Sequence, residues 1–280
     1  MKIAGAQMDV VLGDRESNLS KMTALLEEAA TEGAELVVFP ECSLTGYCFE
    51  SFEEAWVQAE RVPGPSAERM AEECRRLDCH AVYGFLEADG ERMFNACVLV
   101  GPEGVVGTYR KIHLPKLGVD CFNKPGDRPF AVWHVGEAKV GMHICYDGAF
   151  PEAPRAMALL GADLLVLPTN WPPGTECTAG CVPNARALEN NVYYMAVNRV
   201  GTERGFRFIG QSKICDPSGG LLAEAAHAEE TILYAEIDLE NARRKRIVRV
   251  PGKHEIHRFA DRRPEMYGPI VDPGLVPERE

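Results

Sequence analysis

Gly33-Ala34-Glu35-Leu36-Val37-Val38-Phe39-Pro40 has a close counterpart later in the chain, Gly161-Ala162-Asp163-Leu164-Leu165-Val166-Leu167-Pro168. In each segment a Gly-Ala pair ends a helical pattern and leads into a short apolar strand that stops at proline. Strands this apolar are typical of a sheet that is covered on both faces. Two such helix–strand units predict a pseudo-symmetric α/β fold with the helices outside and the strands inside.

The same alternation of patterns extends through most of the chain. No Ser/Gly-rich linker interrupts it, which predicts a single domain over residues 1–280. Residues 251–280 are rich in proline and charge and are expected to form a C-terminal tail, a candidate for a subunit interface. Among the expected helices, Ser66 would cap the one at 66–77. The patterns predict strands at 2–10, 35–39, 81–85, 94–100, 105–109, 139–145, 163–167, 193–198, 210–215 and 231–237, and helices at 17–32, 66–77, 151–160 and 183–190.

Composition narrows the class of protein. The 280 residues include 30 Lys and Arg against 42 Asp and Glu, a formal net charge of −12, which argues against a nucleic-acid partner. Hydrophobic residues make up 46%, too many for a disordered chain, and no apolar run is long enough to cross a membrane. Residues 1–21 carry several charges where a secretory signal would be apolar, so we expect a cytoplasmic protein.

The chain contains ten cysteines, and none of them forms a C-x-x-C pair. The usual zinc and dithiol redox signatures are therefore missing, and no metal site is expected. Most of the ten are expected to be reduced and to act as small core residues. Cys177 and Cys181 either line the mouth of a pocket or are structural.

Three segments place a reactive type of side chain at the end of an expected strand. Glu41 follows Pro40 at the rim of the core, where desolvation raises the pKa of a carboxyl group. Alternation along 105–111 puts Arg110 and Lys111 on opposite faces, so one of them at most faces a pocket. Cys145 ends the run that begins at Val140, and a thiol in a strand-to-helix turn lies near backbone N–H groups that stabilise a thiolate or an oxyanion. Taken singly, Glu41 also fits a surface glutamate at the start of a loop, Lys111 a solvated lysine, and Cys145 a buried cysteine.

Taken together, Glu41, Lys111 and Cys145 in this order resemble the nitrilase, or carbon–nitrogen hydrolase, superfamily, in its amidase- and carbamoylase-like branch. The resemblance covers nearly the whole chain. Its motifs are Pro40-Glu41, Tyr109-Arg110-Lys111-Ile112-His113-Leu114-Pro115, Pro125-Gly126-Asp127, Cys145-Tyr146-Asp147, Phe150-Pro151-Glu152 with Arg155, Leu167-Pro168-Thr169-Asn170-Trp171, Arg186-Ala187-Leu188-Glu189-Asn190, Asn198-Arg199-Val200-Gly201, Asp216-Pro217 with Gly219, and Arg262-Arg263-Pro264-Glu265-Met266-Tyr267.

The resemblance implies an αββα sandwich that assembles as a homodimer or higher homo-oligomer. It also implies hydrolysis of a non-peptide C–N bond in a small linear amide or N-carbamoyl compound, without a metal or organic cofactor. Cys145 would attack as the nucleophile, Glu41 would move the protons, and Lys111 with the backbone N–H of Tyr146 would stabilise the oxyanion. A thioester would form, ammonia or an amine would leave, and water would release a carboxylic acid.

Two departures from the family pattern bear on the site. Family members often carry a further Glu between the Lys and the Cys, but residues 112–136 contain none, which leaves the shorter Asp120 as the candidate accessory acid. Nitrilases usually show Cys-Trp-Glu at the nucleophile, so Cys145-Tyr146-Asp147 favours an amide over a nitrile. Nitrile hydrolysis and a catalytically silent binding or assembly subunit remain the alternatives. The residues expected to line the substrate pocket are Tyr47, His113, Asn170 and Trp171.

Overall fold

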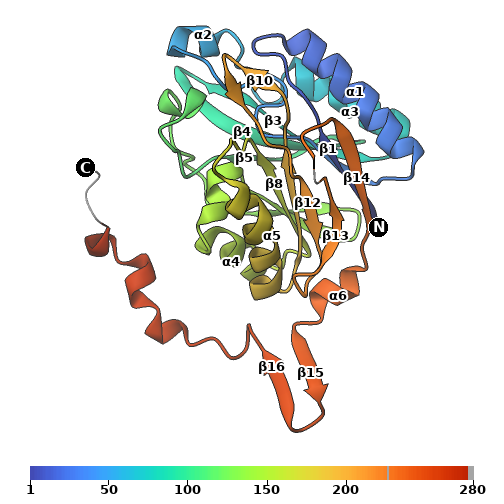
Figure 1. Cartoon of the computed structure of the whole chain (residues 1–280), viewed down its shortest axis with the longest axis vertical. Coiled ribbons are helices and arrows are strands. Elements are labelled where there is room, and N and C mark those ends of the chain that lie inside the picture. Colours follow the sequence, from blue (N-terminus) through green and yellow to red (C-terminus); the bar gives the residue numbers. More distant parts are fainter. Residues whose placement is uncertain (226, 277–280) are drawn as a thin grey trace. The chain divides into compact units, whose positions relative to one another are not determined.

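The computed structural model describes residues 1–225 and 227–276, and the chain divides into two compact units, Met1–Arg243 and Arg244–Glu280. The larger unit contains every predicted site residue (Figure 1). The described part of the smaller unit holds a hairpin and short 3-10 helices, which are β15 (Arg246–Val250), β16 (His254–His257), η3 (Pro264–Met266), η4 (Gly268–Val271) and η5 (Pro273–Leu275). The division falls shortly before residue 251, where the tail was predicted to begin.

Two six-stranded sheets form the centre of the larger unit, counted over its described residues. The first sheet has the order β14 (Thr231–Glu236), β1 (Lys2–Gln7), β2 (Leu36–Val38), β3 (His80–Asp89), β4 (Arg92–Gly101) and β5 (Gly104–Arg110). The second has the order β6 (Val132–Val135), β7 (Ala138–Met142), β8 (Leu164–Thr169), β9 (Tyr193–Asn198), β12 (Lys213–Cys215) and β13 (Leu221–Glu224). A separate two-stranded ribbon joins β10 (Thr202–Glu203) to β11 (Phe206–Arg207).

The two sheets repeat one another strand for strand. Read in the orders above, each sheet has an antiparallel pair, two parallel pairs and two further antiparallel pairs. The matching sequence segments supply the equivalent strands β2 and β8, which are buried along their whole length. Gly33 and Gly161, which precede these strands, both have positive φ angles of 87° and 92°, the left-handed conformation in which a helix commonly ends. The predicted pseudo-symmetry is therefore present in the structure.

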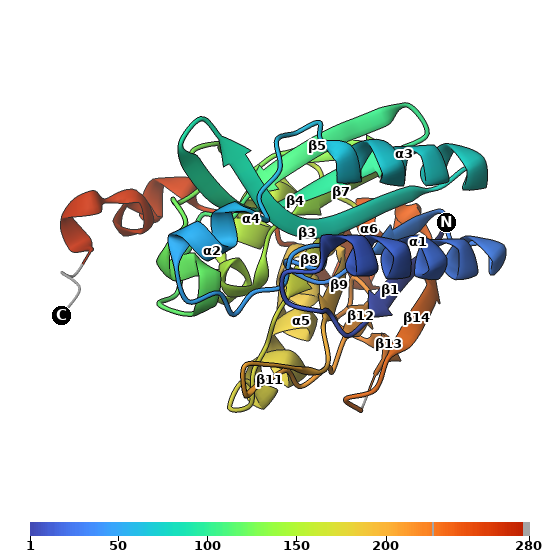
Figure 2. The ribbon, with the colours of Figure 1, turned by 90° about the horizontal axis from the view of Figure 1, so that it is seen from above.

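Successive apolar residues of a strand point to opposite faces of its sheet, so both faces are buried. Ile3, Leu36 and Val38 of the first sheet pack against Met142, Val166 and Met195 of the second, so the sheets lie face to face. The outer face of the first sheet packs against α1 (Arg15–Thr31) and α3 (Pro65–Leu77), which lie side by side in both views (Figures 1 and 2). The second sheet is covered by α4 (Glu152–Leu159) and α5 (Glu176–Asn190).

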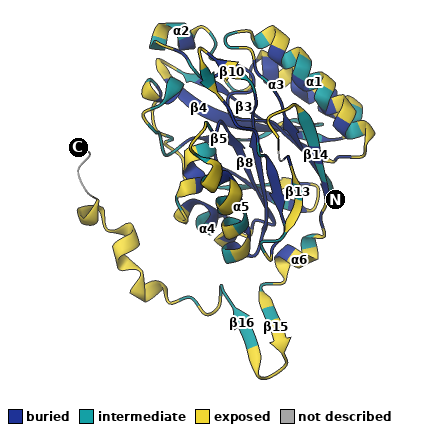
Figure 3. Ribbon diagram, in the orientation of Figure 1, coloured by how far each residue is buried: buried dark blue, intermediate teal, exposed yellow. Residues whose placement is uncertain are grey.

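This arrangement is the predicted αββα sandwich. Figure 3 shows its consequence for burial: the central strands such as β4 and β8 are dark blue, the edge strand β13 is mostly exposed, and the helices are buried along one side only. The short helices α2 (Phe52–Trp56) and α6 (Leu239–Arg243) lie outside the four layers. No helix among the described residues is long and apolar enough to span a bilayer.

Two local predictions about helices were wrong. The cap of α3 is Gly64, and Ser66 lies inside the helix, where its hydroxyl pairs with the Tyr83 hydroxyl at 2.8 Å. Helix α5 begins at Glu176, well before the predicted start at Pro183. Pro183 lies inside this helix, on its buried face with Ala179 and Ala187, although proline cannot donate a helical hydrogen bond there.

Candidate active site

Glu41 is held at the carboxyl end of β2 by close packing of the backbone. The loop after Pro40 approaches β3 so tightly that a Cβ on Gly84 would lie 2.3 Å from the Cys42 nitrogen and 2.7 Å from Glu41 Cα. The Gly84 backbone bonds on both sides of Glu41, to the Pro40 carbonyl and to the Leu44 N–H. Glu41 is consequently fully buried, at a strand end.

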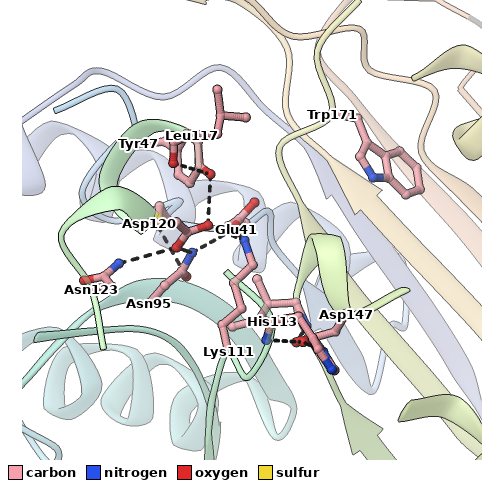
Figure 4. Close-up of polar contacts among 12 residues, drawn as sticks. Glu41, Tyr47, Asn95, Lys111, His113, Leu117, Asp120, Asn123, Asp147 and Trp171 are labelled. Atoms are coloured by element: carbon pink, nitrogen blue, oxygen red, sulfur yellow. Dashed lines mark hydrogen bonds and ion pairs between the residues drawn. The ribbon is translucent and has the colours of Figure 1, made fainter. Parts of the chain in front are cut away.

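Lys111 follows β5 and reaches Glu41 from the neighbouring part of the first sheet. Its Nζ lies 2.7 Å from Glu41 Oε1, and neither side chain is exposed to solvent. Arg110 points to the other side of the strand, where it forms paired hydrogen bonds to Glu87 at 2.9 and 2.6 Å. The alternation predicted for these two basic residues therefore holds, with Lys111 as the one that faces the site (Figure 4).

Asp120 completes a buried cluster with Lys111 and Glu41. Its Oδ2 lies 2.5 Å from Lys111 Nζ and accepts a hydrogen bond from the Tyr47 hydroxyl at 2.9 Å. The carboxylate stands on η1 (Gly118–Cys121), which lies against Tyr47 because Gly118 has no side chain. A Cβ on Gly118 would lie 2.5 Å from the Tyr47 ring, and its φ of 49° also favours glycine. The close approach of the backbone compensates for the shorter side chain of aspartate.

Asn95 is a site residue that the sequence prediction missed. It lies on β4 and donates one amide N–H to Glu41 Oε1 at 2.7 Å and the other to Asp120 Oδ1 at 2.9 Å. Both carboxylates are thereby fixed relative to one another. A lone polar residue between Phe94 and Ala96, in the otherwise apolar run 93–101, is the sequence signal that could have identified it.

Cys145 comes from the second sheet. Strand β7 ends at Met142, earlier than predicted, and Cys145 is the first residue of the 3-10 helix η2 (Cys145–Ala149). Its φ of 46° is unusual for a residue other than glycine and marks a sharp turn. Burial raises the pKa of the thiol to about 12, and the charge of Glu41 acts in the same direction. The Lys111 ammonium, the Asn170 backbone N–H and the Thr169 hydroxyl oppose the rise.

The charges in the cluster depend on one another. Desolvation raises the pKa of Glu41, while the Lys111 ammonium acts to lower it. Burial by itself would lower the pKa of Lys111, but the carboxylates of Asp120 and Glu41 outweigh this and hold that pKa well above its usual value. Lys111 is therefore a fixed cation, and desolvation makes Glu41 easier to protonate than an exposed glutamate.

The other predicted site residues have different surroundings. Tyr47 is buried, with its hydroxyl engaged by Asp120 and by the Leu117 carbonyl oxygen. His113 is half-buried, pairs with Asp147 at 2.7 Å and stacks on the Phe150 ring. The Tyr47 hydroxyl and the His113 Nδ1 atom thus both have hydrogen-bond partners within the protein.

Three more candidates lie close to the nucleophile in sequence or at the end of β8. Tyr146 follows Cys145 in the first turn of η2, where backbone N–H groups lack helical partners, and its side chain is 41% exposed. Asn170 is buried, and both polar atoms of its side chain lack a partner among the described residues. Trp171 is nearly buried, and Figure 4 shows it apart from the Glu41 cluster.

All ten cysteines are free thiols, and five of them are buried. Cys97, on β4, is among the buried ones, as expected of a small core residue. Cys177 and Cys181 are exposed on α5. In the part of the chain that the structure describes, no group of His, Cys, Asp or Glu is arranged to hold a metal ion.

Comparison with known proteins shows the family to which this chain belongs. The model of the family described as carbon-nitrogen hydrolase matches residues 2–247, nearly the whole of the larger unit and slightly beyond it. The chain belongs to the carbon–nitrogen hydrolase family. It is accordingly a hydrolase that acts on carbon–nitrogen bonds other than peptide bonds, and the predicted membership of the nitrilase superfamily is confirmed.

Relatives of this carbon–nitrogen hydrolase carry two kinds of name. A protein named nitrilase from Pyrococcus abyssi is 41% identical over 271 residues, covering 95% of this chain and 99% of its own. Omega-amidase NIT2 of Xenopus tropicalis is 32% identical over 270 residues, 89% of this chain and 94% of its own. Among solved structures, an amidase from Nesterenkonia sp. AN1, with acrylamide added at its active-site cysteine, has a TM-score of 0.75 and 26% identity over 87% of this chain and 95% of its own.

Proposed function

We propose that this hydrolase cleaves the C–N bond of a small linear amide or N-carbamoyl compound through a thioester on Cys145. One observation carries the proposal. Glu41 Oε1 accepts hydrogen bonds from Lys111 and Asn95, whereas Glu41 Oε2 is buried without a partner among the described residues. A carboxylate held on one oxygen and free on the other is suited to take up and return a proton in a site that excludes water.

The first half of the reaction forms the thioester. With its pKa raised, Cys145 is a neutral thiol at rest, so its proton passes to Glu41 as sulfur attacks the amide carbon. The negative charge that develops on the substrate oxygen is stabilised by the Lys111 ammonium and the Tyr146 backbone N–H. The C–N bond then breaks, and Glu41 returns the proton to the leaving nitrogen, which departs as ammonia or an amine.

The second half of the reaction regenerates the thiol. Glu41, now ionised again, takes a proton from a water molecule, whose oxygen attacks the thioester carbon. The C–S bond breaks, the carboxylic acid leaves, and the proton returns to the sulfur. Asp120 contributes by holding Lys111 charged and in place, since its carboxylate lies directly on the ammonium.

An ammonia-release screen tests the substrate class. The panel would hold ω-amides, carbamoyl amino acids, carbamoyl amines and aliphatic amides, each at neutral pH with the full-length protein. We expect ammonia or amine release from at least one of these groups, and a mass increase matching the acyl group on the peptide that contains Cys145. The Cys145→Ala variant should show neither signal. A complete lack of turnover and of adduct across the panel would contradict the proposal.

Nitrile hydrolysis is the second candidate, because the relative from Pyrococcus abyssi at 41% identity is named nitrilase. A nitrile carbon would be attacked by the same thiol, and addition of water would release ammonia and leave the same thioester. Aliphatic nitriles therefore belong in the panel. Turnover of nitriles with none of the amides would favour this second function.

We also propose that the protein works as a homodimer or higher homo-oligomer in the cytoplasm. Leu159 and Leu160 at the end of α4 and Leu188 on α5 are exposed apolar side chains on the outer helical layer, which supports a subunit contact there. Ten free thiols support a reducing compartment. Light scattering of the purified protein tests the assembly, and a monomer at micromolar concentration would contradict it.

A further inference from the structure

The carboxylate of Asp147 is fully buried and accepts hydrogen bonds on both oxygens. Oδ1 is bonded to the His113 backbone N–H at 3.0 Å and to His113 Nδ1 at 2.7 Å. Oδ2 accepts from the Tyr109 hydroxyl at 2.7 Å and from the Ile144 backbone N–H at 3.0 Å. Four donors on one buried carboxylate satisfy the usual condition for keeping such a charge inside a protein.

These donors belong to the two segments that carry the reacting groups. Tyr109 and His113 stand two residues before and two residues after Lys111, at the end of β5 in the first sheet. Ile144 directly precedes Cys145, and Asp147 lies in the same 3-10 helix as Cys145, beyond β7 of the second sheet. One side chain therefore ties the backbone around the ammonium to the backbone around the thiol.

A stacked ring pair reinforces the same connection. The His113 ring lies 3.7 Å from the Phe150 ring, centroid to centroid, and the two planes differ by 12°. Phe150 follows η2 directly, and its N–H bonds to the Asp147 carbonyl oxygen. Figure 4 shows His113 and Asp147 turned toward one another beside Lys111. The orientation of the His113 ring is thus fixed by the turn that carries the thiol.

We propose that Asp147 is a positioning residue that sets the distance between Lys111 and Cys145 across the two sheets. The inference rests on the proposed function only in taking these two as the reacting groups. Among the described residues the carboxylate of Asp147 bonds to Tyr109, His113 and Ile144 and not to the ammonium or the thiol, so its effect passes through those three residues. Small displacements of reacting groups reduce rates by large factors, so the loss of this connection should reduce the rate more than it reduces substrate binding.

The reactivity of Cys145 toward iodoacetamide tests the proposal without any knowledge of the substrate. The full-length protein is alkylated at neutral pH, and peptide mass spectrometry follows Cys145, with the exposed Cys177 as an internal reference. Because the Lys111 ammonium favours the thiolate, Asp147→Asn should slow alkylation of Cys145 relative to Cys177 about 10-fold. With a substrate from the panel, kcat should fall about 10- to 100-fold while KM stays within about twofold.

Asp163→Asn is the matched control. Asp163 is also a buried carboxylate beside the second sheet, but it lies at the amino ends of β7 and β8, away from the ends that lead to Cys145 and Asn170. There it binds the Lys139 N–H and Arg243. This variant should lower thermal stability and leave Cys145 reactivity and kcat unchanged. If Asp163→Asn slows Cys145 as much as Asp147→Asn does, the effect is general loosening and the proposal is overturned.

Tyr109→Phe provides a second variant in case Asp147→Asn does not fold. It removes one hydroxyl donor from the first-sheet side and leaves three donors on the carboxylate. Slower Cys145 alkylation, by a smaller factor than for Asp147→Asn, is the supporting result. If Asp147→Asn folds and its Cys145 is alkylated at the wild-type rate, the proposal is overturned. If Asp147→Asn does not fold, an unchanged alkylation rate in Tyr109→Phe overturns it. Failure of the proposed function would instead appear as a wild-type protein that turns over nothing in the panel.

Discussion

The ammonium of Lys111 lies 2.5 Å from an oxygen of Asp120, with both side chains fully buried. The charge of Asp120 raises the pKa of Lys111, so the lysine stays protonated in a place where burial alone would favour the neutral amine. The site thus holds two buried carboxylates around one ammonium, and the charge state of each group depends on the other two.

Asp120→Asn should lower kcat by about 10²-fold, because the oxyanion then meets a lysine that is less firmly charged and less firmly placed. Steady-state kinetics with a substrate from the panel measures the effect. Asp127→Asn is the control, since Asp127 is a 38% exposed carboxylate that pairs with Arg92 and Arg110 outside the site. Equal losses in both variants would show that Asp120 has no particular importance.

The pH profile should report the ionisation of Glu41. Because the proton acceptor must be ionised, and desolvation raises its pKa above 4.5, kcat/KM should rise with pH through that raised value. The thiol, with a pKa of about 12, should add no limb near neutral pH. Glu41→Gln should lower kcat/KM by about 10²–10⁴-fold and remove the acidic limb from any residual activity. An acidic limb that persists in this variant would assign the ionisation to another group.

Gly84→Ala should damage both stability and activity, because its Cβ would meet the Cys42 nitrogen at 2.3 Å and force the Glu41 backbone away. We expect a loss of about 1–3 kcal/mol in the free energy of unfolding, measured by urea denaturation, and a lower kcat. Gly180→Ala is the matched control. Gly180 lies in α5 with nothing within 4 Å of the new methyl, so this change should stabilise by about 0.5–1 kcal/mol.

Glu203→Gln should destabilise the loop that carries Tyr47. Glu203 forms a buried ion pair with Arg199 and accepts the backbone N–H groups of Tyr47 and Cys48 at 3.0 and 2.8 Å. Breaking a buried pair on one side costs about 3–5 kcal/mol, which thermal unfolding will show. Arg204→Ala removes an exposed ion pair with Glu54 in the same region and should cost about 0–1 kcal/mol. Similar costs for the two variants would contradict the distinction between buried and exposed pairs.

The sequence alone determined the layered fold and the strand ends that carry the reactive residues. The segments 33–40 and 161–168 are apolar throughout, so burial on both faces could be read from composition, and a glutamate or a polar pair after the proline had to lie at the rim of a sheet. Alternation likewise separated Arg110 from Lys111. These features depend on neighbours within a few residues, and local periodicity records them directly.

Only the tertiary structure decided which polar groups meet. Asn95 bonds to Glu41 and Asp120 because β4 lies two places from β2 in the first sheet, in a register that brings these residues together. Asp147 bonds to Tyr109 and His113 because the two sheets pack face to face with a particular offset. No local pattern encodes such a register between distant strands. Asp120 reaches Lys111 despite its short side chain because Gly118 allows η1 to lie against Tyr47, a close approach that is set by packing and not by the residue's own neighbours.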